Sequence, residues 1–302
     1  MSVVEVLEQL GGVADAATLH RATSRRKLRT ALHTGVVVRD ARGRYALPTA
    51  ADALRAAHRL SGVATHRSAA AHWGWEMKWQ PKLATVTVPR KRKVPKARRR
   101  DVKVVWADLR DDEVAEPGFT TRERTVVDCM RHLALDEALA IADSALRHRD
   151  VTKAQLLALT AGLSGKGSRQ ARRVAAEASV EAANPFESVL RALALDVPGL
   201  DVEPQVVLRL DGVTVRPDLL DRSLGVVLEA ESFEWHGDRL ALDRDCVRLN
   251  LLALDGWLIL RFSWEAVMRR PWYVRQTLAA VVAARQRPAR QANRAESARK
   301  SA

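Results

Sequence analysis

Apolar residues at the start of the chain recur at helical intervals. They do so over residues 3–10, and a Gly-Gly pair then ends the segment. Two more short helices are predicted, one that follows a capping Asp15 and one that follows Ser24 and covers 25–34. Gly35 ends the last of them, so the pattern predicts three short helices in succession.

The segment after the third helix predicts a β-hairpin. Its strands are expected at 36–38 and 45–47, with a polar turn at 40–43 between them. On the third helix the apolar stripe that includes Leu28 and Ala31 faces inward, which leaves the basic residues facing outward. These basic residues are Arg25, Arg26, Lys27 and Arg29.

Three short helices and a hairpin, with a basic face on the third helix, follow the order of a winged helix-turn-helix. Residues 1–50 are therefore predicted to be a DNA-binding domain. The alternative is a small helical domain whose arginine-rich face is simply solvated.

Residues 51–165 predict a mixed α/β middle domain. Two strands, at 84–88 and 102–106, flank a loop in which residues 90–100 hold eight basic residues and no acidic one. Helices are expected at 51–60, 68–75, 123–133, 136–148 and 153–163. The glycine-rich segment 162–168 is typical of a linker to the next domain.

Helices and strands alternate beyond the linker, which predicts a third domain over 166–286 with a mixed central sheet. Strands are expected at 202–210, 213–220, 224–231 and 257–262. Helices are expected at 169–183, 185–195 and 240–254 and from Pro271 onward. The turn Asp211-Gly212 joins the first two strands as a hairpin, and residues 287–302 are predicted to be a basic, disordered tail.

The net charge of the chain is +14, which favours a polyanionic partner such as nucleic acid. A GC-rich genome would also raise the arginine content, but the concentration of basic residues in 90–100 indicates a binding surface. The chain has no apolar run of membrane-spanning length, and its first residues lack the basic region of a signal peptide. Cys129 and Cys246 form no CxxC pair, so structural zinc and disulfides are not expected, and a reducing cytoplasm is the expected location.

Three acidic residues fall on neighbouring predicted strands. Asp218 is placed late in one strand, and Glu229 and Glu231 are placed late in the next, where they share a face. Carboxylates are depleted in strands and are costly to bury without a partner. Such a set suits a hard cation such as Mg²⁺, which could activate water for phosphodiester cleavage.

A fourth acid, Glu187, lies on the preceding predicted helix. Asn184 is the expected cap of that helix, which places Glu187 at the third helical position. A glutamate there completes a capping box, so a purely structural role is the alternative to a role in the site.

The order of these acids resembles the PD-(D/E)XK nuclease superfamily, with Glu187 followed by Pro217-Asp218 and by Glu229-Ala230-Glu231. Three later features resemble the very-short-patch-repair endonuclease branch and its relatives in actinobacteria. These features are the segment Phe233-Glu-Trp-His-Gly237, the pair Asp245 and Arg248, and residues 256–265. The resemblance covers about residues 184–280. The amino-terminal region resembles AbiEi-type antitoxins, through Thr65-His-Arg-Ser-Ala-Ala70 and Arg124-Thr-Val-Val-Asp128 in particular.

The nuclease resemblance implies a metal site at Asp218 and Glu229, with the carbonyl of Ala230 as a third ligand. Glu187 would be an outer-sphere acid. The repair-endonuclease branch further implies that His236 serves the attacking water and that Asp245 orients its ring.

The sequence departs from the superfamily at the lysine of the motif, which is Glu231 here, although the repair branch lacks that lysine too. Each later residue also has a structural interpretation. His236 would cap or pack against the helix at 240–254, and Asp245 would form a surface ion pair with Arg248. The tryptophans would belong to the core, and they are Trp235, Trp257 and Trp264.

Together these features predict a DNA endonuclease that depends on Mg²⁺ or Mn²⁺. The alternative is an antitoxin-like DNA-binding regulator without catalysis, whose degenerate nuclease fold is marked by Glu231. DNA is the expected partner and a membrane is not, and a cognate toxin or a second copy of the chain are further candidates. RNA is left open as a substrate, although no aromatic stacking motif favours it.

Overall fold

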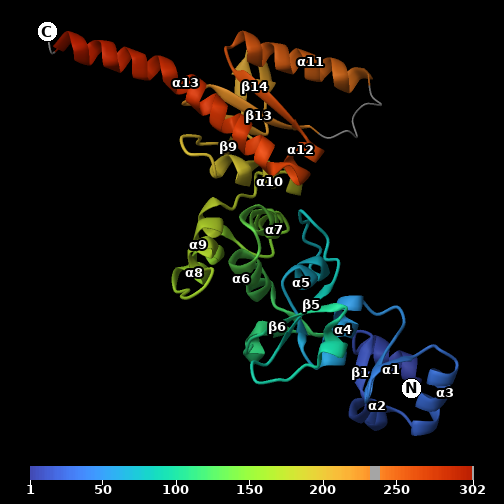
Figure 1. The fold of residues 1–302 in the computed structure, drawn as a ribbon. Helices are drawn as coiled ribbons and strands as arrows, with labels where there is room; N and C mark the ends of the chain where they lie inside the picture. The colour runs from blue at the N-terminus through green and yellow to red at the C-terminus, as the bar shows by residue number, and fades with distance from the viewer. Residues whose placement is uncertain (232–238, 301–302) are drawn as a thin grey trace. The chain divides into compact units, whose positions relative to one another are not determined.

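The computed structural model describes the backbone of residues 1–231 and 239–300, and the side chains of 1–231 and 243–286 (Figure 1). The protein is a mixed α/β protein with several sheets. Its chain forms two compact units. The first consists of Met1–Trp75, Trp79–His132 and Asp150–Ala171, and the second of Glu76–Lys78, Leu133–Arg149 and Arg172–Ala302.

The first unit begins with three helices and a three-stranded antiparallel sheet. In chain order the elements are α1 (Val3–Gln9), β1 (Val13–Asp15), α2 (Ala16–Ala22), α3 (Arg25–His33), β2 (Val38–Ala41) and β3 (Arg44–Ala46). Both predicted caps are present: Thr18 N donates to Asp15 Oδ1 at 2.8 Å, and Lys27 N donates to Ser24 Oγ at 3.3 Å. The strand β1 was not predicted, because three residues carry no readable alternation and their pairing with β3 is a long-range contact.

A five-stranded mixed sheet follows in the first unit, in the order β6-β5-β4-β8-β7. Its strands are β4 (Val63–Ala64), β5 (Ala84–Val88), β6 (Val102–Trp106), β7 (Val114–Ala115) and β8 (Phe119–Thr120). The two long strands, β5 and β6, have the predicted bounds and run parallel. The basic loop at 89–101, which contains the short helix η1 (Lys96–Arg99), is the crossover that parallel strands require.

The helices of this region are α4 (Asp52–Leu60), α5 (Arg67–His72), α6 (Arg122–His132) and α8 (Lys153–Ala161), with a short η2 at Asp111–Glu113. Leu54 and Leu60 of α4 share a buried cluster with Val13 and Ala46. The segments before and after residue 50 therefore pack around a common core within the first unit.

The second unit takes its first helix, α7 (Leu135–Arg147), from the region that the sequence assigns to the middle domain. A buried ion pair accounts for this, because Arg191 Nη2 of α10 (Pro185–Leu195) donates to Asp143 Oδ2 of α7 at 2.8 Å. The Asp143 side chain is fully buried, so its charge requires that partner. The helix α9 (Ser168–Glu177) is shorter than predicted.

The second unit contains a four-stranded mixed sheet in the order β14-β13-β12-β9. Its strands are β9 (Glu203–Pro204), β12 (Leu219–Asp221), β13 (Val226–Glu231) and β14 (Leu258–Ser263). The parallel strands β13 and β14 are connected through α11 (Arg239–Leu254). Leu252 of α11 packs with Val227 of β13, so α11 covers the sheet face that carries the alternate residues Val227, Glu229 and Glu231.

The two long strands predicted at 202–210 and 213–220 are each interrupted. Gln205 has a left-handed φ of 56°, which separates β9 from β10 (Leu208–Leu210). Pro217, which has no N–H to donate, separates β11 (Val213–Val215) from β12. The predicted hairpin turn at Asp211-Gly212 is confirmed, since Leu210 pairs directly with Val213.

The carboxy-terminal segment is the clearest difference from the sequence prediction. After α12 (Trp264–Arg269), the helix α13 runs from Pro271 to Lys300, through residues that were predicted to be a disordered tail. Alanine and arginine dominate this stretch and are strong helix formers. None of the helices in the described part of the chain has the length and hydropathy that a bilayer span requires.

Candidate functional site

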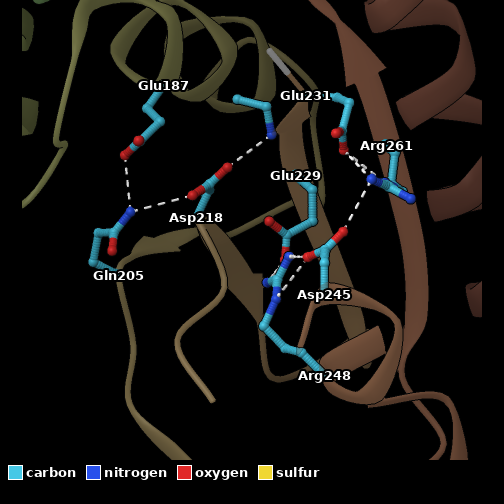
Figure 2. A network of polar contacts seen from close by, with 9 residues as sticks. Glu187, Gln205, Asp218, Glu229, Glu231, Asp245, Arg248 and Arg261 are labelled. Atoms are coloured by element: carbon cyan, nitrogen blue, oxygen red, sulfur yellow. Dashed lines mark hydrogen bonds and ion pairs between the residues drawn. The ribbon is translucent and has the colours of Figure 1, made fainter. Parts of the chain in front are cut away.

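The predicted acids of the second unit lie together, and Figure 2 shows the polar network that joins them. Glu187 belongs to α10, while Glu229 and Glu231 belong to β13. Asp218 directly precedes β12, where it was expected to lie late in a strand, because the break at Pro217 moves the start of that strand to Leu219.

The carboxylate of Asp218 is held from two sides. Its Oδ2 accepts the backbone N–H of Ala230 at 2.8 Å, and its Oδ1 accepts Nε2 of Gln205 at 3.3 Å (Figure 2). The backbone N–H of Gln205 also donates to the carbonyl of Asp218 at 3.0 Å. These bonds fix the orientation of Asp218 toward β13. The proposed ligand role of the Ala230 carbonyl stays a prediction.

Gln205 links Asp218 to Glu187 and was not identified from the sequence. Its Nε2 donates to Glu187 Oε2 at 2.9 Å. A non-glycine residue with φ of 56° is unusual, and such backbone strain clusters at functional sites. Neither the strain nor the pairing of β9 with β12 leaves a signal in the sequence, so the structure alone places Gln205 in the site.

Glu187 is both a helix cap and a member of the network. Its backbone N–H donates to Asn184 Oδ1 at 3.0 Å, and its carboxylate accepts Ala183 N at 2.9 Å and Asn184 Nδ2 at 2.8 Å. The same carboxylate reaches Gln205, so Glu187 both supports the start of α10 and belongs to the site. The predicted capping box is replaced by bonds to Ala183 N and to the side chain of Asn184, in place of the backbone N–H of Asn184. Burial raises the pKa of Glu187, and the nearby charge of Asp218 raises it further.

Glu229 is the most strongly perturbed acid of the site. The residue is only 5% exposed. Burial, followed by the charge of Asp218, raises the pKa of Glu229 to about 7, although Arg248 acts in the opposite direction. Burial also raises the pKa of Asp218. Burial of both carboxylates and the charge of Asp218 beside Glu229 make ionisation of the site costly, and a bound cation relieves that cost.

Arg248 of α11 forms the predicted ion pair with Asp245 and a second ion pair with Glu229. Its Nη1 donates to Glu229 Oε1 at 2.6 Å, and its Nη2 donates to Asp245 Oδ1 at 2.6 Å. Burial opposes the charged guanidinium, but the charges of Glu229 and Asp245 and the hydrogen bonds that they accept outweigh it and raise the pKa of Arg248. Arg248 therefore remains a cation between the carboxylates of Glu229 and Asp245.

A second arginine, Arg261, compensates the acid that stands in place of the superfamily's lysine. Arg261 of β14 lies opposite Glu229 in the parallel register. Its Nε donates to Glu231 Oε2 at 2.7 Å, and its Nη2 donates to Asp245 Oδ2 at 3.2 Å (Figure 2). The negative charge of Glu231 is thus paired rather than added to the site. An arginine within the otherwise apolar strand predicted at 257–262 was the signal that could have suggested this.

His236 and Trp235 lie outside the described residues. Among the side chains that the structure describes, the partners of Asp245 are Arg248 and Arg261, so the orientation of His236 by Asp245 stays a prediction. Trp257 packs against the cluster beneath α11, as a core residue does, and Trp264 is half-buried.

Asp218 and Glu229 provide oxygen ligands of the kind that Mg²⁺ and Mn²⁺ bind. Among the described residues, no third His, Cys, Asp or Glu ligand atom joins these two within 4.8 Å. Mg²⁺ commonly binds one or two carboxylates and completes its shell with water and substrate phosphates. The donor set therefore fits such an ion, with Glu229 shared between the ion and Arg248.

The basic residues predicted on α3 are exposed in the first unit, while Leu28 and Ala31 are buried beneath them. Lys27 Nζ donates to the carbonyl of Met1 at 3.1 Å. Within the described part of the chain, no carboxylate pairs with the side chains of Arg25, Arg26 or Arg29. Three guanidinium groups are thus available on one helix.

No protein-family model matches the chain, and no curated protein matches its sequence. The structure is similar to the crystal structure of the Rv2827c protein from Mycobacterium tuberculosis, with 16% sequence identity and a TM-score of 0.38. The similarity covers 67% of this chain and 82% of that one. A structural similarity this weak does not indicate a function for the chain.

Proposed function

We propose that the protein is a DNA-binding endonuclease that depends on Mg²⁺ or Mn²⁺. The observation that carries the proposal is the pair of acids Asp218 and Glu229. Glu229 lies on β13, and Asp218 directly precedes the neighbouring strand β12 and is linked through Gln205 to Glu187. Asp218 is oriented by a backbone N–H and an amide donor, and Glu229 by the guanidinium of Arg248. Burial raises the pKa of both acids, and repulsion by the charge of Asp218 raises that of Glu229 further. A cation between them offsets that repulsion.

The finer fold assignment is part of the same proposal. Residues 1–50 would be a winged helix-turn-helix of the kind that AbiEi-type antitoxins carry, in which α3 enters the major groove and β2 and β3 form the wing. Residues 166–286 would be a PD-(D/E)XK domain, supported by the mixed sheet β14-β13-β12-β9 and by the crossover through α11.

Each residue of the site would have a distinct task. Asp218 and Glu229 would hold the ion, and when bound, the ion supplies a Lewis acid and a more acidic water. Gln205 and the N–H of Ala230 would keep Asp218 in place. Arg248 would hold the carboxylate of Glu229 in one orientation.

The proton of the attacking water also needs an acceptor. His236 would take it, since its unperturbed pKa of about 6.5 is suited to general-base chemistry near neutral pH. Arg261 removes the main electrostatic objection to catalysis, because it neutralises Glu231 beside the site.

A non-catalytic DNA-binding regulator is the second candidate, and one observation favours it. Arg248 already forms a charge-assisted hydrogen bond with one oxygen of Glu229, so the site contains an internal cation where the endonuclease proposal places the metal. In that case the domain is a scaffold, and DNA binding by α3 is the whole activity.

Cleavage of supercoiled and linear DNA by the full-length chain at millimolar Mg²⁺ or Mn²⁺ tests the proposal. We expect nicking or cutting by the parent and its loss in Asp218→Asn and Glu229→Gln. Glu203→Gln is the matched control, because Glu203 is an exposed acid of the same sheet. A parent that binds DNA tightly, binds no divalent cation by calorimetry and leaves the DNA intact would establish the regulator instead.

A further inference from the structure

A second constellation of metal-ligating side chains lies in the first unit, apart from the carboxylate site. His66 caps the amino-terminal end of α5, and Asp128 and His132 belong to α6. Asp128 and His132 are four residues apart, so they lie one helical turn apart on the same face. Among the described residues, these three are the group whose possible ligand atoms all lie within 4.8 Å of one another.

The separation of the two imidazole nitrogens suits a shared ion. His66 Nε2 lies 3.1 Å from His132 Nδ1. Two nitrogens on one tetrahedral Zn²⁺, at the usual bond length, stand about 3.3 Å apart. The two nitrogens are thus already close to the separation that a shared ion requires, and the carboxylate of Asp128 lies within 4.8 Å of both. Two nitrogens and one carboxylate oxygen form a common protein donor set for such an ion.

Two of the three ligands, His66 and Asp128, are held on their far side by another group. Thr65 Oγ1 lies 2.9 Å from His66 Nδ1, and Thr65 in turn contacts Thr87 Oγ1 at 3.0 Å. Arg124 Nε donates to Asp128 Oδ2 at 2.9 Å. Metal-binding histidines and carboxylates are typically oriented by such hydrogen bonds to their remaining atoms.

The backbone and the burial of the site indicate that its geometry is imposed. His66 has a left-handed φ of 53°, which a non-glycine residue rarely adopts. His66 and Asp128 are only 5% and 3% exposed, whereas His132 lies at the surface. The site is thus fixed on its inner side and open to solvent at His132.

Basic and acidic groups both lie near the site, since Lys103 acts on the imidazole of His66 and Arg131 on that of His132. Arg124 is the basic residue that contacts Asp128, and it is shared with Glu113, whose Oε1 lies 2.9 Å from Arg124 Nη1. One guanidinium thus faces two carboxylates.

We propose that His66, Asp128 and His132 bind one divalent transition-metal ion of the Zn²⁺ class, with water in the remaining coordination position. Imidazole nitrogen selects Zn²⁺, Co²⁺ or Ni²⁺ over Mg²⁺ and Ca²⁺, so this site is chemically distinct from the carboxylate site. Three protein ligands and an open position are the coordination pattern of sites that exchange a ligand.

Titration of the full-length chain with Co²⁺ tests the proposal, because tetrahedral Co²⁺ absorbs visible light far more strongly than octahedral Co²⁺ does. The titration is made in an Asp218→Asn background, which removes binding at the carboxylate site. We expect one equivalent of Co²⁺ with intense visible bands, displaced by Zn²⁺ and unaffected by excess Mg²⁺.

Two variants connect that signal to the site. His132→Gln should abolish the bands, and it should leave the fold intact because His132 is exposed. His33→Gln is the matched control, since His33 is an exposed histidine at the end of another helix, and it should keep them. Zn²⁺ should also raise the Tm of the control but not that of His132→Gln. Absence of the bands in the Asp218→Asn protein, or their persistence in His132→Gln, would show that the histidines form only a hydrogen-bonded pair.

Discussion

The carboxylate site of the second unit is rich in acids, and the basic face of α3 in the first unit is rich in arginines. The two differ in whether their arginines are paired with carboxylates. At the site each arginine is bound to acids: Arg248 joins Glu229 to Asp245, and Arg261 joins Glu231 to Asp245. On α3 the described structure pairs no carboxylate with Arg25, Arg26 or Arg29. The arginines of the site therefore organise the protein itself, whereas those of α3 are free to bind an external polyanion.

The difference also separates two uses of arginine that composition cannot distinguish. A guanidinium between buried acids fixes geometry and prevents an uncompensated charge. A solvated guanidinium on a helix adds little stability and retains its full attraction for phosphate. The net charge of +14 therefore does not by itself locate the DNA-binding surface.

The largest expected effect comes from removing the free arginines. The triple variant Arg25→Ala, Arg26→Ala, Arg29→Ala should lose affinity for DNA on the order of a hundredfold at low salt. The slope of log K against log salt concentration should fall by about three, one for each phosphate contact. Fluorescence anisotropy with duplex DNA at several salt concentrations measures both.

The control removes the same charge from arginines that already have partners. Arg59, Arg110 and Arg122 pair with Asp101, Asp112 and Asp150. Their triple alanine variant should change the salt slope much less. Equal effects of the two triple variants would mean that net charge, and not the face of α3, governs DNA binding.

Removing an arginine that is paired with acids should reduce the stability of the protein, in contrast to the loss of DNA affinity expected on α3. Arg248→Met leaves Glu229 without its cation and Asp245 with Arg261 alone, and we expect a loss of about 1–3 kcal/mol in the free energy of unfolding. The value lies below that for a fully buried pair because the Arg248 side chain is 27% exposed. Urea denaturation measures it, and the addition of Glu229→Gln should recover part of the loss.

Arg222→Met provides the comparison for that experiment. Arg222 pairs with Glu203 at 3.5 Å, and both side chains are more than half exposed, at 57% and 59%. Its loss should be close to neutral. A similar cost for both variants would contradict the distinction between organising and surface arginines.

A smaller effect is expected at His236. If the parent cleaves DNA, His236→Ala should slow cleavage at least about tenfold, because the water loses its base, while metal affinity changes little. Single-turnover cleavage and calorimetry with Mn²⁺ separate the two. Unchanged cleavage would assign His236 a structural role only.

The smallest effect concerns pH. The pKa of Glu229 is raised to about 7 in the folded protein, so between its ordinary value of 4.5 and 7 the folded state binds more protons than the unfolded state. In the absence of divalent cations, stability should therefore fall as pH rises through that window. Denaturation at several pH values in a chelating buffer should show the decline in the parent and a flatter dependence in Glu229→Gln. A rise of stability across the window in the parent would contradict the shift.

The same denaturation experiment with Mg²⁺ present tests whether the ion binds at these acids. A cation at the site favours the ionised acids, so Mg²⁺ should stabilise the protein more at pH 8 than at pH 6. A pH-independent stabilisation would indicate that Mg²⁺ binds elsewhere.

The sequence by itself determined the features that depend on local chemistry. The caps at Asp15 and Ser24 and the turn at Asp211-Gly212 were predictable, because each needs only a side chain or backbone conformation within a few residues. The long strands β5 and β6 were predictable from their runs of β-branched residues. The acids of the site were found as well, because carboxylates in strands are rare.

Only the tertiary structure decided what those acids contact. Gln205, Arg248 and Arg261 come from separate elements, and they reach the site through the pairing of β9 with β12, the crossover of α11 and the parallel register of β13 with β14. The same holds for His66, which meets Asp128 and His132 across 62 residues of chain or more. Sequence patterns record the periodicity within an element, whereas the partner of a buried charge is set by long-range packing, which no local pattern encodes.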